Sequence, residues 1–278
     1  MKQQLKYVLK KIGIYHSLQL AYRSAIDSLE KNRNKLLYSK LKGSGFTCNF
    51  CNQKYQRFVP EIPPSRIGQV IKKYNVIAGY GENVYCPNCM SKNRERLLLA
   101  VMQDRVDTGG KQILHFSPER NLYDYLKNKA IVTTVDSTPG FYKNIDPKIS
   151  YADATGLLFE SQSFDLVIAN HILEHIPDDI KAISEIYRVL KPGSTAILQV
   201  PFSASIPTTI EDPYINNPEK QEELFGQKDH VRIYGLNNYI SRVESVGFQN
   251  AVLPPCRLEK YQNFAIQENE YVFMFIKR

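Results

Sequence analysis

The sequence of 278 residues has no tryptophan, only five cysteines and no run of about 18 consecutive apolar residues. Without such a run, no helix of the chain is expected to cross a membrane. Residues 1–20 also lack an apolar stretch followed by a small-residue cleavage site, which argues against a secretory signal. Because 43% of the residues are hydrophobic and 23% are charged, as in ordinary globular proteins, we expect a soluble protein. The missing secretory signal leads us to expect it in the cytoplasm.

The positive charge of the sequence is unevenly distributed. Residues 1–43 contain ten Lys or Arg against two acidic residues, and the remaining residues contain 26 of each sign. The formal net charge of +8 therefore belongs to an N-terminal leader. Because domains commonly have about 100 to 200 residues, the length suits one α/β domain with a smaller appendage.

The leader, residues 1–45, has the periodicity of an amphipathic helix. Apolar residues recur three or four positions apart with lysines between them, which predicts a basic helix that ends near Gly43 and Gly45. Such a helix can pack on its own domain or a dimer partner, lie on the inner face of an anionic membrane, or contact nucleic acid. Nucleic acid is the least favoured, since aromatic residues are not interleaved with base-reading positions. The apolar positions are Leu5, Val8, Leu9, Ile12 and Tyr15.

Four of the five cysteines form two C-x-x-C pairs, Cys48 with Cys51 and Cys86 with Cys89, separated by 34 residues. Two such pairs can surround a metal with four thiolates in a tetrahedron, the arrangement typical of structural Zn²⁺. A redox pair is the alternative, but a redox C-x-x-C normally occurs once, at a strand-to-helix junction. We therefore predict a structural zinc site, and we expect the fifth cysteine, Cys256, to be a buried thiol.

From residue 109 onward, apolar stretches alternate with helical ones. The expected strands include residues 112–116, 131–136, 164–170, 195–202, 251–255 and 270–278, with helices near 118–128 and 177–190. This alternation predicts a Rossmann-like, doubly wound, mostly parallel sheet covered on both faces. The expected organisation is a helical leader (1–45), a zinc-binding segment with a linking helix (46–108) and an α/β domain (109–278).

Polar residues lie at the expected carboxyl ends of successive strands, where open α/β sheets bind nucleoside ligands. Asp136 is placed to accept hydrogen bonds from both hydroxyls of a ribose. Asp153, with Ala154 beside it, is placed to bind an adenine amino group. Asn170 and His171 are expected near the reacting part of the ligand.

Residues 153–201 contain the elements DxTxLxF, SFDxVxxxHxLEHIxD and ExxRVLKPG. Together they resemble the core of class I S-adenosylmethionine-dependent methyltransferases, in particular the type 11 group. The stretches CPNCMSKNRER, LHFSPE and FGQKDHVRIYG further resemble a bacterial branch of that group with a cysteine-bearing leader. The resemblance covers about residues 109–278 and implies S-adenosylmethionine as cofactor.

The loop after the first strand departs from the family pattern of an acid followed by spaced glycines. This chain has His115, Phe116, Ser117, Pro118 and Glu119 there, and we expect His115, Ser117, Pro118 and Glu119 to contact the cofactor. Ser117 is expected to cap the next helix, with Pro118 at its first position, so that free N–H groups face the methionine carboxylate. Glu119 is expected to pair with the cofactor ammonium.

The motif HILEHIP places His171, Glu174 and His175 on one side of a helical turn. His171, His175 or the later His230 can accept a proton from an acceptor hydroxyl. Alternatively, these histidines and Glu174 hold a divalent metal, as in metal-assisted O-methyltransferases that the motif resembles. A zinc peptidase is disfavoured, because the motif closes a Rossmann-like strand and no further acidic ligand helix is evident.

The stretch FGQKDHVRIYG follows a long irregular segment of the kind that forms substrate walls. We expect Gln227, Asp229, Arg232 and Tyr234 to contact the acceptor. The favoured function is O-methylation of a small-molecule or glycan- or lipid-linked acceptor with His as general base. Two alternatives stay open: an RNA or protein methyltransferase that grips its substrate through the zinc segment, and a degenerate, binding-only domain.

Overall fold

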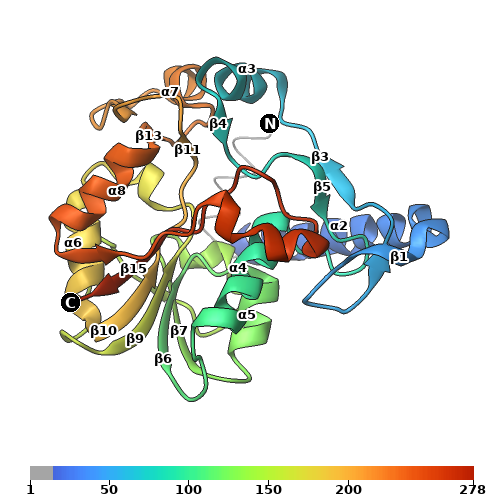
Figure 1. The fold of residues 1–278 in the computed structure, drawn as a ribbon, viewed down its shortest axis with the longest axis horizontal. Helices are drawn as coiled ribbons and strands as arrows, with labels where there is room; N and C mark the ends of the chain where they lie inside the picture. Colours follow the sequence, from blue (N-terminus) through green and yellow to red (C-terminus); the bar gives the residue numbers. More distant parts are fainter. Residues whose placement is uncertain (1–14) are drawn as a thin grey trace.

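The computed structural model describes residues 15–278, and its centre is a seven-stranded sheet (Figure 1). The strand order is β14-β15-β10-β9-β6-β7-β8, and β8, β7, β6, β9 and β10 run parallel, whereas β15 is antiparallel to both of its neighbours. This is the expected doubly wound, mostly parallel fold. The strands are β6 (Gln112–Phe116), β7 (Ile131–Asp136), β8 (Ser150–Tyr151), β9 (Phe164–Ala169), β10 (Leu190–Ile197), β14 (Phe248–Asn250) and β15 (Met274–Lys277).

The central strands are apolar on both faces because helices cover both. In β9, Val167 and Ala169 belong to one hydrophobic cluster, and Leu166 and Ile168 belong to the other. This alternation follows from side chains that point to opposite faces in turn. Helices α6 (Asp179–Val189) and α8 (Leu236–Ser245) lie on the first face, and α4 (Asn93–Arg105) and α5 (Arg120–Leu126) lie on the second (Figure 1).

The direction in which the chain winds reverses between β6 and β9. From β6 the chain proceeds outward through β7 and β8, and β9 begins the other half, which continues to β10. In open α/β sheets, this switch point leaves a crevice at the carboxyl ends of the two strands. The fold therefore locates the candidate site next to Phe116 and Ala169, the last residues of β6 and β9.

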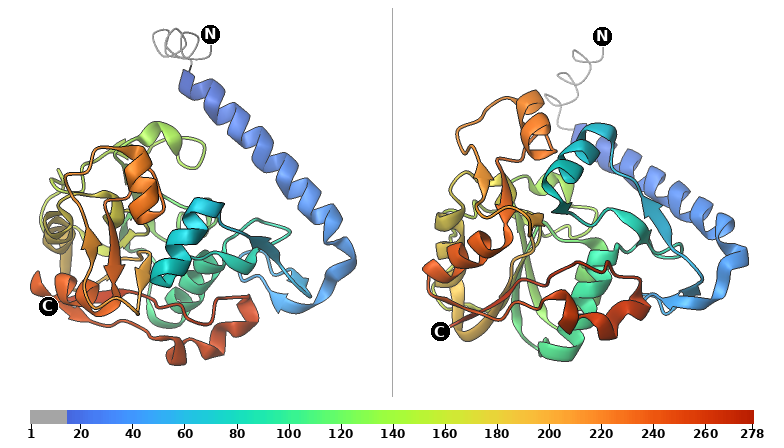
Figure 2. Two further views of the ribbon diagram at one scale, coloured as in Figure 1. Left: turned by 90° about the horizontal axis from the view of Figure 1, so that it is seen from above. Right: turned by 45° about the horizontal axis from the view of Figure 1, so that its top comes forward.

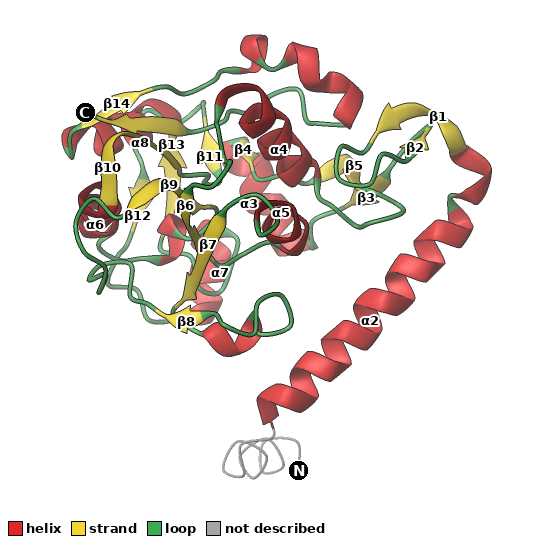
Figure 3. Cartoon of the chain, turned by 90° about the horizontal axis from the view of Figure 1, so that it is seen from below, coloured by secondary structure: helices red, strands yellow, loops and turns green. Residues whose placement is uncertain are grey.

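The N-terminal helix α2 (Tyr15–Leu37) extends away from the sheet as a long arm (Figures 2 and 3). It ends six residues before Gly43, where the leader helix was expected to end, and a 3-10 turn, η1 (Ser39–Leu41), follows. The apolar and basic positions predicted between residues 2 and 12 lie outside the described residues. None of the helices between residues 15 and 278 has the length and apolarity that a membrane span requires.

The cysteine-bearing segment contains two small antiparallel pairs, β1 (Lys42–Thr47) with β2 (Lys54–Tyr55) and β3 (Val59–Glu61) with β5 (Gly81–Tyr85). Helix α3 (Ser65–Tyr74) and β4 (Val76–Ile77) lie between β3 and β5 in the chain. Strand β4 pairs with β11 (Phe202–Ser203) of the later chain. The stretch 203–230, expected to be irregular, contains β12 (Ile210–Glu211) and α7 (Pro218–Phe225), and β13 (Arg232–Gly235) joins β11 and β12 in a four-stranded sheet.

Arg96 fastens the cysteine-bearing segment to the C-terminal part of the chain. Its guanidinium is fully buried, stacks on the ring of Phe58 at 4.5 Å and donates hydrogen bonds to five backbone carbonyls. Because a buried charge needs all its donors satisfied, these bonds fix the relative position of three chain segments. The accepting carbonyls belong to Asn83, Val84, Ser91, Phe264 and Ala265.

The C-terminal region differs from the sequence expectation in two places. The strand expected at 251–255 is reduced to one bridge between Leu253 and Val272, because Pro254 and Pro255 have no N–H to donate to a ladder. Two 3-10 turns follow, η4 (Pro255–Arg257) and η5 (Glu259–Phe264). Cys256 lies in η4 and is exposed, so the expectation of a buried thiol was wrong.

Candidate active site and cysteine cluster

A cavity of about 1700 Å³ opens at the switch point of the sheet. Small-molecule sites commonly measure about 300 to 1000 Å³, so this cavity has room for a cofactor and an acceptor together. Its walls also include residues of α2 and the N-terminal end of α4. Ten residues expected at the site line it: Ser117, Pro118, Glu119, Asp136, Asp153, Ala154, Asn170, His171, His175 and Asp229.

Asp136 and Asp153 border the same cavity from the ends of neighbouring strands. Asp136 ends β7, where its carboxylate accepts hydrogen bonds from the Ser117 hydroxyl at 2.6 Å and from the backbone N–H of Thr138. Asp153 follows β8 and accepts bonds from the backbone N–H and the hydroxyl of Thr155, both at 2.8 Å. These bonds from Thr155 hold the pKa of Asp153 below its usual value, so this carboxylate is ionised at neutral pH.

Ser117 does not cap the helix that follows it. Helix α5 begins at Arg120, and its N-cap residue is Glu119, which makes no side-chain capping bond. Ser117 has φ = 45°, in the left-handed region, and its hydroxyl donates to Asp136. Two competing hydrogen bonds explain the difference. The bond that the Ser117 hydroxyl donates to a carboxylate is stronger than the one it would accept from a helix N–H, and the left-handed backbone of Ser117 brings its side chain to Asp136.

Glu119 is a buried carboxylate at the centre of a hydrogen-bonded group. It accepts bonds from His115 Nε2 at 2.8 Å and from Asn170 Nδ2 at 3.0 Å. Burial raises the pKa of Glu119, but the hydrogen bond and charge of His115, aided by Arg94 and Asn170, lower it below the usual value. His115 itself is fully buried and does not line the cavity, so its expected contact with the cofactor is corrected to support of Glu119.

Two cavity residues at the start of α4, Arg94 and Glu95, were missed by the sequence reasoning. They lie in the stretch CPNCMSKNRER, of which only the cysteines were assigned roles. Glu95 accepts a bond from Asn121 Nδ2 at 3.1 Å. Burial, with the nearby charge of Glu119, raises the pKa of Glu95 to about 7.

The raised pKa makes a prediction for Glu95→Gln. The folded protein binds the Glu95 proton more tightly than the unfolded chain does, so the free energy of unfolding falls as pH rises from 4.5 toward about 7. Glutamine removes this loss, and the variant is expected to be more stable than the native protein by about 1 to 3 kcal/mol at pH 8, with little gain at pH 4.5. Urea unfolding at the two pH values measures the difference. The exposed Glu244→Gln is the control, and an equal effect of Glu95→Gln at both pH values would contradict the assignment.

The histidine motif forms a 3-10 turn, η3 (Leu173–His175), rather than an α-helical turn. His171 precedes it with φ = 54°, and its backbone N–H donates to the Gln199 carbonyl at 2.7 Å. The side chains of His171 and His175 reach the cavity, and Glu174 is buried beneath them with its carboxylate 3.5 Å from His171 Nδ1. Burial raises the pKa of Glu174, but His171 and the other two histidines lower it to about 2.

Of the four residues expected on the acceptor side, only one lies at the cavity. Asp229 lines the cavity and lies 3.3 Å from His175 Nδ1, whereas Gln227 is exposed outside the cavity. Arg232 and Tyr234 are fully buried, which corrects the expectation that they face an acceptor. They hold the η3 region instead: Arg232 donates to the carbonyls of Leu173, Ile176 and Pro177, and the Tyr234 hydroxyl donates to Asp179 at 2.7 Å.

His230 also lies behind the cavity wall. It is 4% exposed, and its ring centroid is 4.6 Å from that of His175, with the rings nearly perpendicular. The expectation of direct contact with an acceptor is therefore corrected, because the His175 ring stands beside His230 and is the one that reaches the cavity. His230, Glu174 and His175 together form a group that could hold a metal.

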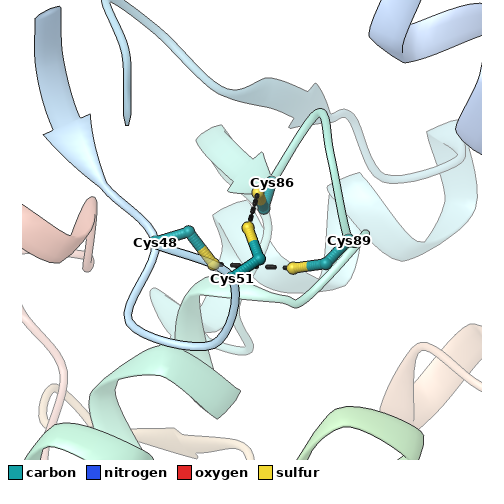
Figure 4. Close-up of side chains that lie close together, drawn as sticks. All are labelled: Cys48, Cys51, Cys86 and Cys89. Atoms are coloured by element: carbon teal, nitrogen blue, oxygen red, sulfur yellow. Dashed lines mark hydrogen bonds between the residues drawn. The ribbon is translucent and has the colours of Figure 1, made fainter. Parts of the chain in front are cut away.

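The four paired cysteines converge from two matching turns (Figure 4). The N–H of Cys48 donates to the Gln53 carbonyl and the Asn52 N–H donates to the Cys48 carbonyl, and the same two bonds recur between Cys86, Ser91 and Met90. In each turn the fourth residue after the first cysteine, Asn52 or Met90, has a left-handed backbone. The two turns thus present their thiols in equivalent ways.

The spacing of the sulfurs tests whether zinc fits. Sγ atoms are 3.5 Å apart between Cys48 and Cys89 and 3.7 Å apart between Cys51 and Cys86, and all four lie within 4.8 Å of one another. Tetrahedral Zn²⁺ with bonds of about 2.3 Å places its sulfurs about 3.8 Å apart. The cluster is therefore compatible with a zinc knuckle. The exposed Cys256 is not part of it.

Comparison with known families adds the deciding observation. Residues 118–198 match the model of a family described as a methyltransferase domain, and this range runs from the loop after β6 through β10. In this segment the chain is similar to methyltransferase domains. The acids Asp136 and Asp153 and the histidine motif all lie within the matched range.

Two curated relatives match short stretches of the chain. Phosphoethanolamine N-methyltransferase 2 of Caenorhabditis elegans is 43% identical over 51 residues, which cover 18% of this chain and 12% of that protein. Demethylmenaquinone methyltransferase of Staphylococcus epidermidis is 38% identical over 50 residues, which cover 18% of this chain and 21% of that protein. The chain thus spans well under two thirds of either relative.

Among solved structures, an S-adenosylmethionine-dependent methyltransferase from Mesorhizobium loti has 14% sequence identity and a TM-score of 0.45. The match covers 64% of this chain and 96% of that one. A possible histamine N-methyltransferase from Thermotoga maritima has 16% identity and a TM-score of 0.45, over 67% and 91% of the two chains. At this level of similarity, neither structure indicates an acceptor for this chain.

Proposed function

We propose that the protein transfers the methyl group of S-adenosylmethionine to a hydroxyl group of a small-molecule, glycan-linked or lipid-linked acceptor. The observation that carries this proposal is the gathering of Glu119, Asp136, Asp153 and His171 around one cavity at the switch point of the sheet. Three carboxylates suit a ligand with a ribose, an amine and an adenine. The histidine suits an acceptor that loses a proton as it gains a methyl group.

The cavity offers each part of the cofactor a complementary group. Asp136 would accept hydrogen bonds from the ribose hydroxyls, and Asp153, beside Ala154, would accept one from the adenine amino group. Glu119 would pair with the ammonium group, next to Asn170, whose Oδ1 is buried without a partner in the described part of the chain. An ionised carboxylate and a free carbonyl oxygen together form a site that fits a positively charged donor. When bound, S-adenosylmethionine supplies an activated methyl group on its charged sulfur.

His171 is proposed to accept the hydroxyl proton of the acceptor. Its Nδ1 faces the Glu174 carboxylate, which can accept a hydrogen bond from the Nδ1–H and so leave Nε2 as the free base. The backbone next to this ring is fixed, because the His171 N–H donates to the Gln199 carbonyl and Arg232 donates to the carbonyls of η3 and of the two residues after it. These contacts keep the ring at the cavity wall, beside Glu174.

Two measurements test the function. Calorimetry with S-adenosylhomocysteine should show one site per chain; no binding would favour a degenerate domain and overturn the proposal. A screen of sugars, glycans and lipid-linked glycans for S-adenosylhomocysteine formation should then identify acceptors, with mass spectrometry locating the new methyl group. Exclusive methylation of nitrogen, or of RNA or protein substrates included in the screen, would contradict O-methylation of the proposed acceptors.

For the best acceptor of that screen, His171→Ala is expected to lower kcat by about 100-fold or more, the usual contribution of a general base. The affinity for S-adenosylhomocysteine should change by less than about threefold, because His171 is assigned to the acceptor and not to the cofactor. Asp178→Asn, at another position on the cavity rim, is the matched control and should retain kcat. A loss of cofactor affinity in His171→Ala equal to the loss of kcat would contradict the role.

We further propose that Cys48, Cys51, Cys86 and Cys89 bind a structural zinc ion. The sulfur spacing and the two matching turns support this proposal, and four thiolates complete a tetrahedral shell with no position open for catalysis. Because Arg96 connects the second cysteine turn to the C-terminal region, the zinc would also stabilise the position of α4. The zinc site would thereby support the cavity wall formed by Arg94 and Glu95.

A further inference from the structure

Glu174, His175 and His230 form a second group of metal-ligating side chains, separate from the cysteines. Each offers one ligand atom, and the three atoms lie within 4.8 Å of one another. Glu174 and His175 belong to η3, and His230 comes from the segment just before β13. Two elements distant in sequence thus bring one carboxylate and two imidazoles together at the wall of the cavity.

Two atoms in this group lack any hydrogen-bond partner among residues 15–278: Glu174 Oε2 and His230 Nε2. The residues are 1% and 4% exposed, so water does not readily solvate these atoms. Buried polar atoms of native proteins are normally paired, and an unpaired carboxylate oxygen is especially costly. Both atoms can serve as electron-pair donors, and a cation between them would satisfy both.

Neighbouring groups leave these atoms available as ligands. Glu174 Oε1 faces His171, which leaves Oε2 as the free oxygen. His175 Nδ1 faces Asp229 Oδ2 at 3.3 Å, which leaves Nε2 as the free nitrogen. A carboxylate on the second ring nitrogen is the usual companion of a metal-bound histidine, because it fixes the tautomer and the orientation of the ring.

We propose that Glu174, His175 and His230 bind a divalent transition-metal ion at the acceptor side of the cavity. Mixed nitrogen and oxygen donors favour Mn²⁺, Fe²⁺, Co²⁺ or Zn²⁺ over Mg²⁺ or Ca²⁺, which prefer oxygen alone. Ligand atoms bound at about 2.1 Å are at most about 4.2 Å apart, so a movement of about half an ångström closes the site. His175, which is partly exposed, has room for such a movement.

The surrounding structure holds the two parts of the site in register. The backbone N–H of Val231 donates to the Glu174 carbonyl at 3.0 Å, directly beside His230. Arg232 donates to three carbonyls around η3. The ligands are therefore placed by backbone contacts that do not depend on the ion. Since His175 also lines the cavity, the ion would lie where an acceptor hydroxyl can reach it, a role that rests on the proposed function.

Metal binding is tested on the full chain with its cysteine-bound zinc retained. Titration with Mn²⁺, followed by the loss of the free-ion electron paramagnetic resonance signal, and parallel calorimetric titrations with Co²⁺ and Zn²⁺ should show one added ion per chain. His230→Asn and Glu174→Gln are each expected to weaken this binding at least tenfold. The number of zinc ions retained at the cysteines should stay unchanged in both variants, as measured by elemental analysis.

The exposed Glu160→Gln is the matched control and should bind the added ion as the native chain does. His230→Asn guards against misfolding of Glu174→Gln, and the unfolding temperature of each variant is measured alongside. Absence of a stoichiometric site for all three ions, or equal binding by native chain and both variants, would overturn the proposal. Because no cofactor or acceptor is present, the result is independent of the calorimetry with S-adenosylhomocysteine that tests methyl transfer.

Discussion

Replacement of Cys86 by serine is expected to lower the midpoint of thermal unfolding by about 10 °C or more and to abolish stoichiometric zinc. Cys86 is fully buried, and its sulfur lies 3.7 Å from that of Cys51. Structural zinc contributes about 10 to 16 kcal/mol to the folding of small zinc units, and loss of one ligand forfeits a substantial part of this. Calorimetric melts and elemental analysis of the purified chain measure both effects.

The effect should extend beyond the cysteines. The guanidinium of Arg96 binds the Ser91 carbonyl of the second cysteine turn and the Ala265 carbonyl near the C-terminus. If the cysteine turn becomes disordered, Arg96 loses its first contact and holds the C-terminal segment less firmly. Affinity for S-adenosylhomocysteine is expected to fall as well, because Arg94 and Glu95 share α4 with Arg96. Cys256→Ser is the control, since that thiol is exposed and apart from the cluster. A Cys86→Ser chain that melts like the native one would refute the structural zinc.

Asp136→Ala is expected to weaken the binding of S-adenosylhomocysteine by about 100-fold or more. The Asp136 carboxylate is assigned two hydrogen bonds to the ribose, and bonds of this kind contribute about 1.5 to 3 kcal/mol each. Isothermal titration calorimetry measures the change directly. The exposed Asp124→Ala on α5, which does not line the cavity, should bind S-adenosylhomocysteine as the native protein does.

The same substitution removes the partner of the Ser117 hydroxyl, so the structural part of the effect must be separated. Ser117→Ala also breaks this bond but leaves the carboxylate in place, and it is expected to cost less than about tenfold in affinity. If Ser117→Ala and Asp136→Ala weaken binding equally, Asp136 acts on the loop and not on the ribose. If neither weakens it, the cofactor does not occupy the end of β7.

The sequence was sufficient to predict the sheet and much of the cavity. Apolar strands bounded by helices specify a doubly wound fold, and the fold then dictates that residues at successive strand ends, such as Asp136 and Asn170, meet at one edge. This inference needed no knowledge of distant contacts. The acids and the histidine motif are therefore predicted to lie together by the order of strands and helices alone.

The contributions of distant segments could not be predicted in the same way. Arg94 and Glu95 reach the cavity because α4 docks on the second face of the sheet, and no local pattern encodes that docking. Arg232 and Tyr234 occur in a polar, aromatic stretch that is typical of a substrate wall, but pairing of β13 with β11 turns them inward. Periodicity indicates which side of a strand is apolar, but it does not indicate what covers that side.

Backbone geometry explains the two local errors at the site. The capping role of Ser117 assumed an ordinary N-cap conformation, whereas the residue adopts φ = 45°. The helical turn assumed for the histidine motif is a 3-10 turn preceded by His171 at φ = 54°. Left-handed conformations at residues other than glycine and asparagine are uncommon, so sequence patterns give little warning of them.

Helix α2 borders the cavity with Ser24, Asp27, Glu30 and Lys31, although it belongs to none of the sheets. A shortened chain starting after Leu37 would keep every strand of the described residues, every residue assigned to the cofactor and all four hydrophobic clusters. Its cavity would nevertheless lose the part of the wall that α2 forms. Exchange of ligands measured on such a minimal domain would be faster, and its choice among acceptors broader, than in the full chain.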